Sequence, residues 1–493
     1  MSFFTPESIV IGDLAESYEI SPDGLTLTFH IRQGVHWQDK PPVNGRELVA
    51  EDIAFHFQRF MGQGDFADAE PSPHATSISK LPIESIEAPD RYTVVFKLSK
   101  PDFNAFNNIY YDSNDGGFIY PPEIIKQYGD AQDWRNLVGS GPYMLTDWVK
   151  DSAITYTKNA NYWRFDEKFP ENRLPYLDEV KILVIPDASA KMAALRTGKT
   201  ARLWLASLDE GRAIQRTNPE ILSSISLELP WTFAMDVRKP PFDDIRVRRA
   251  MQLALDLETI NDTLFDGLGD TTPYGVVGPG VPGYFIPFEE WPQELKDNHG
   301  YDPERAKQLL AEAGYPNGFE TKMDFSTANT YWSNLDYTQL AVDYWAQIGV
   351  DVEIDTMEMA VLRAHFSDHT YEGMTYGMRG ANWPPLGAIR TMAHSESPVN
   401  ASGVRDPVYD AMVEAAENAG STEEMRELVK KADMYFSEQQ WVTWGPTRPN
   451  YIFWQPWMVG YNGELTIGGG QHLLYLSRVW LDSDLREEMT GTR

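Results

Sequence analysis

The sequence predicts an α/β fold built from two or three domains. The chain has 493 residues, more than a single hydrophobic core usually serves. A strand pattern at residues 25–32 is followed by a helix pattern at 51–60, and the same succession recurs at 177–198 and at 323–354. Strands that alternate with helices along a chain favour a sheet whose faces are covered by helices.

The stretch from residue 13 to residue 60 shows the clearest local pattern. Apolar and polar residues alternate behind the turn Ser21-Pro22-Asp23-Gly24, which predicts a half-buried strand. The apolar positions of that strand are Leu25, Leu27, Phe29 and Ile31. After a second turn at Asn44-Gly45, apolar residues recur at helical spacing behind acidic residues that suit a helix N-terminus. These residues are Ile53, Phe57 and Phe60, and Glu51 and Asp52.

The later elements follow from the same two periodicities. We expect strands at 92–98, 153–158, 177–186, 323–326 and 350–354. We expect helices at 189–196, from about 244 to 255, and at 302–313, 335–348, 407–418 and 422–440. The second of these helices has one apolar stripe, with Asp243 or Asp244 placed to cap its start.

Composition excludes several classes of protein. The chain contains no cysteine, so it has no disulfides, no thiolate metal sites and no cysteine nucleophile. A formal charge of −31 argues against nucleic acid as a partner, because phosphates require Lys and Arg on the protein. We find no apolar run of 18 residues, and the first residues lack the basic and apolar regions of a signal peptide.

Catalytic motifs are absent from the sequence. It holds no H-E-x-x-H, no G-x-S-x-G and no phosphate-binding G-x-x-x-x-G-K-S/T. His365 and His369 lie four residues apart and could hold a metal with a third ligand from elsewhere, although a solvated helix is the simpler interpretation. A glycoside hydrolase stays conceivable because many carboxylates accompany 15 tryptophans, but no spacing singles out a pair. We therefore expect no enzyme, no catalytic residue, no metal and no cofactor.

Several motifs, in register along the chain, resemble those of the family-5 extracellular solute-binding proteins. These are the dipeptide, oligopeptide and nickel receptors of bacterial ABC importers. The matching residues begin with Pro22-Asp23-Gly24, Phe29-His30-Ile31-Arg32, Gly34-Val35-His36-Trp37 and Ala50-Glu51-Asp52-Ile53. They continue with the turn at 139–143 and with the segment P-F-D-D-I-R-V-R-R-A at 241–250. The apolar stripe assigns the last segment to helix packing rather than to ligand contact.

The resemblance implies a two-lobed, periplasmic-binding-protein-like α/β fold of the class II or cluster C type, with an extra N-terminal α+β subdomain. That subdomain would cover 1–135, the core of lobe I would cover 136–235 and 456–493, and lobe II would cover 236–455. The chain would cross between the lobes near 232–240 and return near 455. In the family, a first strand and a secretion signal precede the matched stretch, so we expect this chain to start late relative to the family.

Aromatic residues in loops between elements are the candidates for ligand contact, because rings offer flat apolar area to peptide side chains or sugar faces. They are Trp231, Phe233, Tyr331, Trp332 and Trp383. The segment 380–385 takes the place of a family loop whose aspartate, in peptide-binding relatives, pairs with the α-amino group of the ligand. This chain has Asn382 there, and an amide cannot neutralise an ammonium group. Arg379 could meet a carboxylate or stack on a ring, or it could be a surface arginine.

The resemblance implies a monomeric receptor that captures an oligopeptide or a related solute between its two lobes. The receptor would deliver this solute to the permease subunits of an ABC importer. It would act outside the cytoplasm, in the periplasm or lipid-anchored at the outer face of the cell membrane. Asn382 and the loop tryptophans favour a second hypothesis, the same role for an oligosaccharide or another uncharged solute. A secreted glycoside hydrolase is the third hypothesis.

Overall fold

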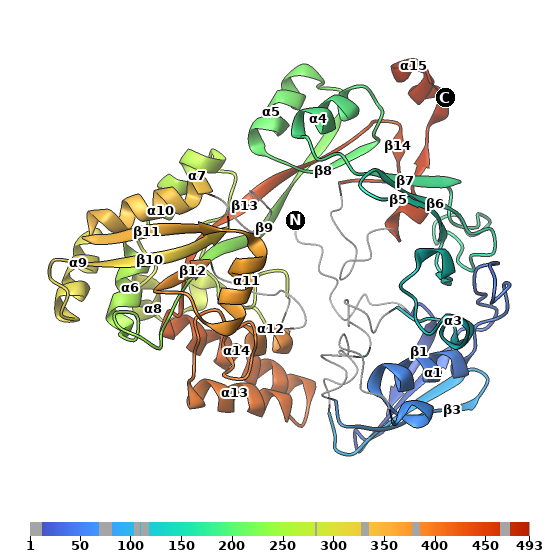
Figure 1. Cartoon of the computed structure of the whole chain (residues 1–493), viewed down its shortest axis with the longest axis horizontal. Helices are drawn as coiled ribbons and strands as arrows, with labels where there is room; N and C mark the ends of the chain where they lie inside the picture. The colour runs from blue at the N-terminus through green and yellow to red at the C-terminus, as the bar shows by residue number, and fades with distance from the viewer. Residues whose placement is uncertain are drawn as a thin grey trace. The chain divides into compact units, whose positions relative to one another are not determined.

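The computed structural model describes residues 12–68, 81–102, 109, 118–281, 283–326, 335–376, 385–463 and 474–492. The chain forms two compact units (Figure 1). The N-terminal unit contains the described residues up to Ile225 and those from Tyr451 onward, and the middle unit is Ser226–Asn450. Both units mix helices and strands, which confirms the predicted α/β class.

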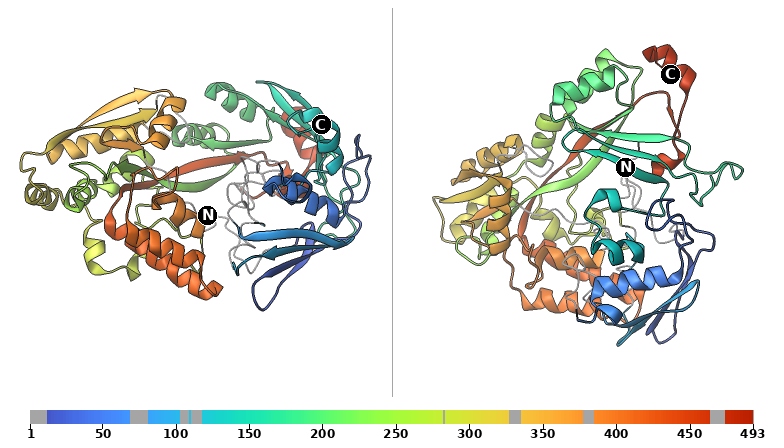
Figure 2. Two further views of the ribbon diagram at one scale, coloured as in Figure 1. Left: turned by 60° about the horizontal axis from the view of Figure 1, so that its bottom comes forward. Right: turned by 45° about the vertical axis from the view of Figure 1, so that its right-hand side comes forward.

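The N-terminal unit begins with a four-stranded antiparallel sheet of strand order β1-β2-β4-β3 (Figure 2). Its strands are β1 (Ala15–Ile20), β2 (Thr26–Ile31), β3 (Ile83–Asp90) and β4 (Thr93–Leu98). The helical elements beside it are α1 (Ala50–Met61), η2 (Gly64–Phe66), α3 (Pro122–Tyr128) and η4 (Trp134–Asn136). The Phe57 ring of α1 meets the Phe96 ring of β4 edge-on at 5.3 Å, in a core that these elements share. The predicted first strand and helix are therefore confirmed.

An ionic network explains the motif residues around the start of α1. Asp52 is 3% exposed and accepts hydrogen bonds from the Val49 N–H at 3.1 Å and from Trp37 Nε1 at 3.1 Å. Arg46 donates to both Asp52 oxygens at 2.8 Å and also pairs with Glu123 of α3. The tryptophan and the aspartate of the matched motifs thus fasten a loop to a helix start, which is a structural role.

The rest of the N-terminal unit surrounds a three-stranded antiparallel sheet of order β5-β6-β7. The strands of this sheet are β5 (Tyr143–Val149), β6 (Ala153–Lys158) and β7 (Glu179–Leu183). The elements that follow it in the chain are α4 (Ala188–Arg196), β8 (Arg202–Ala206) and α5 (Leu208–Thr217). The C-terminal elements are β14 (Met458–Val459), η6 (Tyr475–Arg478), β15 (Trp480–Leu481) and α15 (Ser483–Thr490). The strands predicted at 153–158 and 177–186 and the helix predicted at 189–196 are confirmed.

The middle unit is organised around a mixed sheet of order β11-β10-β12-β9-β13-β8, in which β8 pairs with the part of β13 that follows Asn450. Its other strands are β9 (Leu222–Met235), β10 (Phe319–Ser326), β11 (Val350–Met357), β12 (Met374–Tyr376) and β13 (Val442–Trp454). Strand β10 runs parallel to β11 and to β12, and β12 runs antiparallel to β9. The units divide within β9, after Ile225, and within β13, after Asn450. The lobe boundaries expected at 235 and 455 lie near these divisions and stay predictions.

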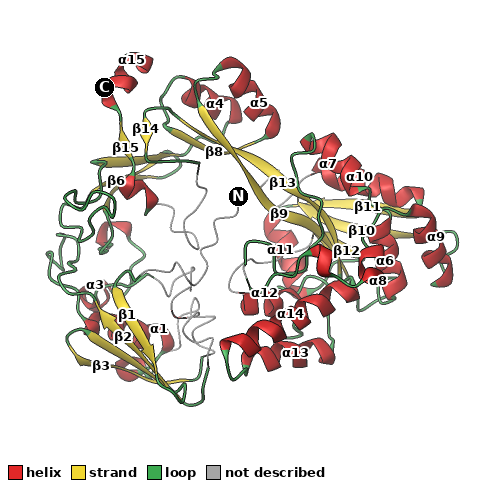
Figure 3. Ribbon diagram, turned by 180° about the vertical axis from the view of Figure 1, so that it is seen from behind, coloured by secondary structure: helices red, strands yellow, loops and turns green. Residues whose placement is uncertain are grey.

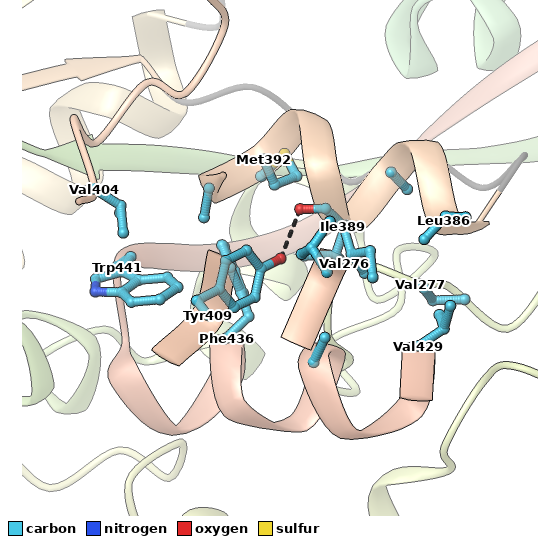
Figure 4. Packing of buried hydrophobic residues seen from close by; sticks show 14 of the residues in the cluster. Val276, Val277, Leu386, Ile389, Met392, Val404, Tyr409, Val429, Phe436 and Trp441 are labelled. Atoms are coloured by element: carbon cyan, nitrogen blue, oxygen red, sulfur yellow. Dashed lines mark hydrogen bonds between the residues drawn. The ribbon is translucent and has the colours of Figure 1, made fainter. Parts of the chain in front are cut away.

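Helices cover both faces of the middle sheet (Figure 3). The helical elements are α6 (Ile245–Leu253), α7 (Leu257–Phe265), η5 (Phe288–Glu290), α8 (Gln293–Asp297), α9 (Pro303–Glu312), α10 (Leu335–Gln347), α11 (Met359–Asp368), α12 (Pro385–Ala393), α13 (Pro407–Glu417) and α14 (Thr422–Gln439). On the face of α12 and α14, Tyr409 is enclosed by apolar side chains and donates its hydroxyl hydrogen bond to the Ile389 carbonyl at 2.6 Å (Figure 4). The buried hydroxyl group of Tyr409 therefore has a hydrogen-bond partner inside this apolar core.

The segment 241–250 has the packing role that its apolar stripe predicted. Asp244 caps α6 by accepting from the Arg246 N–H at 2.8 Å. Arg248 is 5% exposed and donates to the carbonyls of Phe242 at 2.8 Å, Asp243 at 3.1 Å and Gln439 at 3.0 Å. Burial lowers the pKa of Arg248 to about 10, so this guanidinium stays charged near neutral pH while it ties α6 to the end of α14.

Candidate functional site

The carboxyl edge of the middle sheet brings together the two strand ends that precede segments in which ligand contacts were predicted. The register of β10 and β12 pairs Met323 with Met374 and Asp324 with Thr375, so Ser326 and Tyr376 end neighbouring parallel strands at one edge. Residues 327–334 follow Ser326 directly, and residues 377–384 follow Tyr376. Ligands of open α/β sheets bind outside the carboxyl ends of the strands.

Five predicted ligand residues belong to these two segments and lie outside the described residues. They are Tyr331, Trp332, Arg379, Asn382 and Trp383. The structure therefore places the strand ends from which the two segments start, and it leaves the contacts of these five side chains as predictions.

Trp231 and Phe233 lie in β9, so the expectation that they occupy a loop is wrong. Phe233 pairs in register with Tyr376 of β12, at the carboxyl edge. The Trp231 and Phe233 side chains are 3% and 2% exposed, because both point to the face of the sheet that α10 covers. The sequence could not show this, since a short aromatic run reads equally as a loop or as a buried strand. Their contact with ligand stays a prediction.

Tyr337 of α10 packs against both of these aromatic residues. Its ring stacks on Phe233 at 5.2 Å between centroids and 15° between planes, and on Trp231 at 5.5 Å and 22°. Trp345, two turns further along α10, meets Phe233 edge-on at 5.3 Å. Sequence reasoning missed Tyr337, although Tyr337, Ala341 and Trp345 repeat every four residues and mark one buried face of α10.

The indole of Trp231 brings polar character to this aromatic cluster. Its Nε1 is buried and has no hydrogen-bond partner among the residues that the structure describes. The guanidinium carbon of Arg448, from β13, lies 5.8 Å from the centroid of the Trp231 ring, within the range of a cation–π contact. Aromatic faces, an indole donor and a guanidinium therefore lie close together near the end of β12, the mixture expected of a small-molecule site.

Polar residues occupy the opposite face of the same strand ends. Asp324 is 5% exposed, and its Oδ2 lies 2.7 Å from Nδ1 of His365 on α11. His369 instead directs its Nε2 to the Asn400 carbonyl at 2.7 Å. The two histidines thus have separate partners and do not form the shared metal face that their spacing allowed. No group of three candidate metal ligands occurs within the described ranges.

A hollow also lies in the wall of the N-terminal unit. It measures about 1090 Å³ and includes Arg32, Trp163 and Arg164 in its wall. The guanidinium carbons of Arg32 and Arg164 lie 4.6 and 4.7 Å from the Trp163 ring centroid. Both cations lie near carboxylates, Arg32 at 3.9 Å from Glu16 and Arg164 at 3.0 Å from Asp13. The strand-edge site remains the better candidate, because two of the predicted ligand segments start there from the carboxyl ends of neighbouring parallel strands.

The fold and the position of the site define the class of this protein. Two α/β units, joined by long strands and carrying candidate ligand residues at a carboxyl sheet edge, are typical of two-lobed binding proteins. The family model described as "Bacterial extracellular solute-binding proteins, family 5 Middle" matches residues 10–399. The chain belongs to this family. It is a solute-binding receptor of the kind that serves ABC importers, as the opening motifs indicated.

Curated relatives and solved structures agree with this assignment. The chain is 31% identical over 451 residues to heme-binding protein A of Haemophilus influenzae, covering 86% of this chain and 77% of the relative. It is 28% identical over 449 residues to a dipeptide-binding protein of Pseudomonas aeruginosa, covering 87% and 80%. The periplasmic binding protein DppA of Helicobacter pylori, solved with the peptide STSA, has a TM-score of 0.74 at 25% identity over 96% of this chain and 89% of that one. NikA of Brucella suis, solved with Fe(III)-EDTA, shares the fold with a TM-score of 0.78 at 19% identity over 97% and 93%.

Among the helices that the structure describes, none combines the length and the apolar character needed to cross a membrane.

Proposed function

We propose that this receptor captures an oligopeptide or a related solute at the carboxyl edge of the middle sheet. The single observation that carries the proposal is the register of β10 and β12. Because of this register, the two segments that contain five of the predicted ligand residues start from adjacent strand ends. Relatives named for dipeptides and a relative named for glutathione support a peptide or a peptide-like ligand.

The predicted residues divide the work by their chemistry. The rings of Tyr331, Trp332 and Trp383 offer apolar faces to ligand side chains, and Arg379 offers a guanidinium fork to a carboxylate. Trp231 and Phe233 supply an aromatic base behind these contacts. Binding favours a closed form only to the extent that ligand contacts are better there, and two-lobed closure is part of this proposal.

The second candidate ligand is an oligosaccharide or another uncharged solute, and the observation that favours it is Asn382. A hydrogen bond to a charged partner contributes about 1.5–3 kcal/mol, against about 0.5–1.5 kcal/mol for a neutral one. An amide at this position therefore stabilises a bound, charged peptide N-terminus less than an aspartate would. The same amide can form hydrogen bonds with a hydroxyl group or a blocked amine of the ligand.

The remaining parts of the proposal concern setting and partners. The receptor works outside the cytoplasm, in the periplasm or lipid-anchored at the outer face of the cell membrane, and passes its solute to the permease subunits of an ABC importer. It acts as a monomer and carries out no chemistry on the ligand. A secreted glycoside hydrolase is the third hypothesis, and steady turnover of an oligosaccharide by the purified protein is the result that would favour it.

Isothermal titration calorimetry tests the proposal with two sets of probes. Defined tripeptides are titrated first, followed by maltotriose and cellotriose. We expect saturable heat with at least one tripeptide, at a Kd in the micromolar range or below. Saturation by a trisaccharide without any by the peptides would replace the first candidate with the second.

A further inference from the structure

The Tyr337 side chain packs the first turn of α10 against the sheet. Tyr337 is the third residue of α10, and its side chain is 1% exposed between the rings of Trp231 and Phe233. Stacked aromatic pairs contribute beyond the apolar area that they bury, and a ring with two stacking partners has few alternative orientations. The contact therefore sets where α10 begins relative to β9.

A glycine on a third element completes this arrangement. A Cβ added to Gly445 of β13 would lie 2.1 Å from the hydroxyl oxygen of Tyr337 and 2.4 Å from its Cζ. Gly445 does not have a left-handed backbone, so the position requires glycine for space rather than for conformation. Strands β9 and β13 and helix α10 thus meet around one tyrosine ring.

The location of this contact relates it to the ligand site. Phe233 pairs in register with Tyr376, the last residue of β12, and it stacks on Tyr337 at the start of α10. One aromatic pair therefore connects the end of one strand at the carboxyl edge with the helix that packs beside that edge. A displacement of Tyr337 would alter the geometry of the edge without removing any predicted ligand contact.

We propose that Tyr337 is a positioning residue of the ligand site, which fixes the first turn of α10 against β9 at the carboxyl edge of the middle sheet. The expected effect of Tyr337 on ligand binding rests on the proposed function. Its geometric part stands on described residues alone and can be tested without a ligand.

Spin labels measure the geometry directly, because the chain has no cysteine of its own. Asp336→Cys on α10 and Thr356→Cys on β11 place two labels at exposed positions near the carboxyl edge. Pulsed electron resonance on the full chain should give one narrow distance distribution. Tyr337→Leu should broaden it at least about twofold, because the ring that restricts α10 is gone. Tyr337→Phe, which keeps the ring, should restore most of the narrow distribution.

The matched control is Phe242→Leu. Phe242 is 1% exposed and meets Phe319 edge-on at 5.7 Å, but Phe319 begins β10 at the opposite edge of the same sheet. This control should leave the label distances unchanged. A broad distribution without any Tyr337 substitution, no change in Tyr337→Leu, or equal broadening in Phe242→Leu would each overturn the inference.

A binding measurement then connects the geometry to function. With a tripeptide that the unmodified protein binds, Tyr337→Leu should weaken the affinity about tenfold or more, whereas Phe242→Leu should change it by less than about twofold. Unaltered affinity in Tyr337→Leu would contradict the role of this residue in the site. If the unmodified protein binds no probe, the proposed function fails, while the label distances still decide the geometric part.

Discussion

The Asp433 carboxylate accepts a hydrogen bond from the Val276 N–H at 2.5 Å inside the core of the middle unit. The same oxygen also accepts from the Val277 N–H at 3.2 Å. Asp433 is 3% exposed, and burial raises its pKa to about 7 against the opposing effect of the two N–H groups. This residue makes the stability of the fold depend on pH near neutrality.

The folded state binds the Asp433 proton more tightly than the unfolded state does, because the carboxyl pKa is near 4 when the chain is unfolded. The free energy of unfolding should therefore fall as pH rises from about 4 to about 7 and level off above that window. Asp433→Asn keeps an oxygen acceptor and cannot ionise, so it should lose this slope. Above pH 7 it should be more stable than the unmodified protein by about 1–3 kcal/mol. Urea unfolding at pH 5 and pH 8 checks this, and identical slopes in both proteins would contradict it.

Arg46 joins the loop before α1 to α3 through two carboxylates. It donates to both oxygens of Asp52 at 2.8 Å and to Glu123 at 2.7 Å, and these contacts raise the pKa of the guanidinium. A lysine has no fork to serve both acids. Arg46→Lys should lower the free energy of unfolding by about 2–4 kcal/mol, and Trp37→Phe, which removes one bond to Asp52, by about 1 kcal/mol. A larger loss of stability in Trp37→Phe than in Arg46→Lys would contradict this prediction. It would show that the hydrogen bond from the Trp37 indole to Asp52, rather than the ion pairs of Arg46, holds the loop before α1.

Gly445 provides a sharp test of packing in the middle unit. Gly445→Ala would place a methyl group 2.1 Å from the Tyr337 hydroxyl oxygen, so the ring or the strand must move. We expect a loss of about 1–3 kcal/mol in the free energy of unfolding. Gly300→Ala is the control, since a Cβ at Gly300 meets nothing within 4 Å and should change stability by less than about 1 kcal/mol. Equal effects of the two substitutions in chemical denaturation would rule out the predicted clash.

The role of Asn382 in ligand selection can be tested by introducing the aspartate that peptide-binding members of the family are expected to have at this position. Asn382→Asp should strengthen binding of a tripeptide with a free α-amino group about tenfold, because the new carboxylate can pair with an ammonium. It should not strengthen binding of the N-acetylated form of the same peptide. Calorimetric titration of both peptides into both proteins checks this. Equal gains for the two peptides would show that the amine does not reach position 382.

Much of the fold could be predicted because local patterns and tertiary packing agree. The alternation at Ala153–Lys158 and the capped helix behind Asp302-Pro303 specify β6 and α9 without any information from distant residues. The three-residue strand β12 (Met374–Tyr376) was not predicted, because so short an element exists only through its pairing with β10 and β9.

The candidate site could be predicted less well, because local spacing does not show which element faces a side chain. Trp231 and Phe233 resemble loop aromatics in sequence, and their burial follows from the packing of α10 on β9. The spacing of His365 and His369 suggested one shared face, but His369 ends α11 with a left-handed backbone and turns its ring towards Asn400. In both cases a residue distant in sequence determines where the side chain points.

Native mass spectrometry of the purified protein, before and after mild unfolding, tests the central claim most directly because it weighs whatever small molecule copurifies. Capture of an oligopeptide or a related solute predicts a released species, or a ladder of species, with peptide masses. A hexose or pentose series would contradict the peptide assignment and favour the uncharged solute that Asn382 allows.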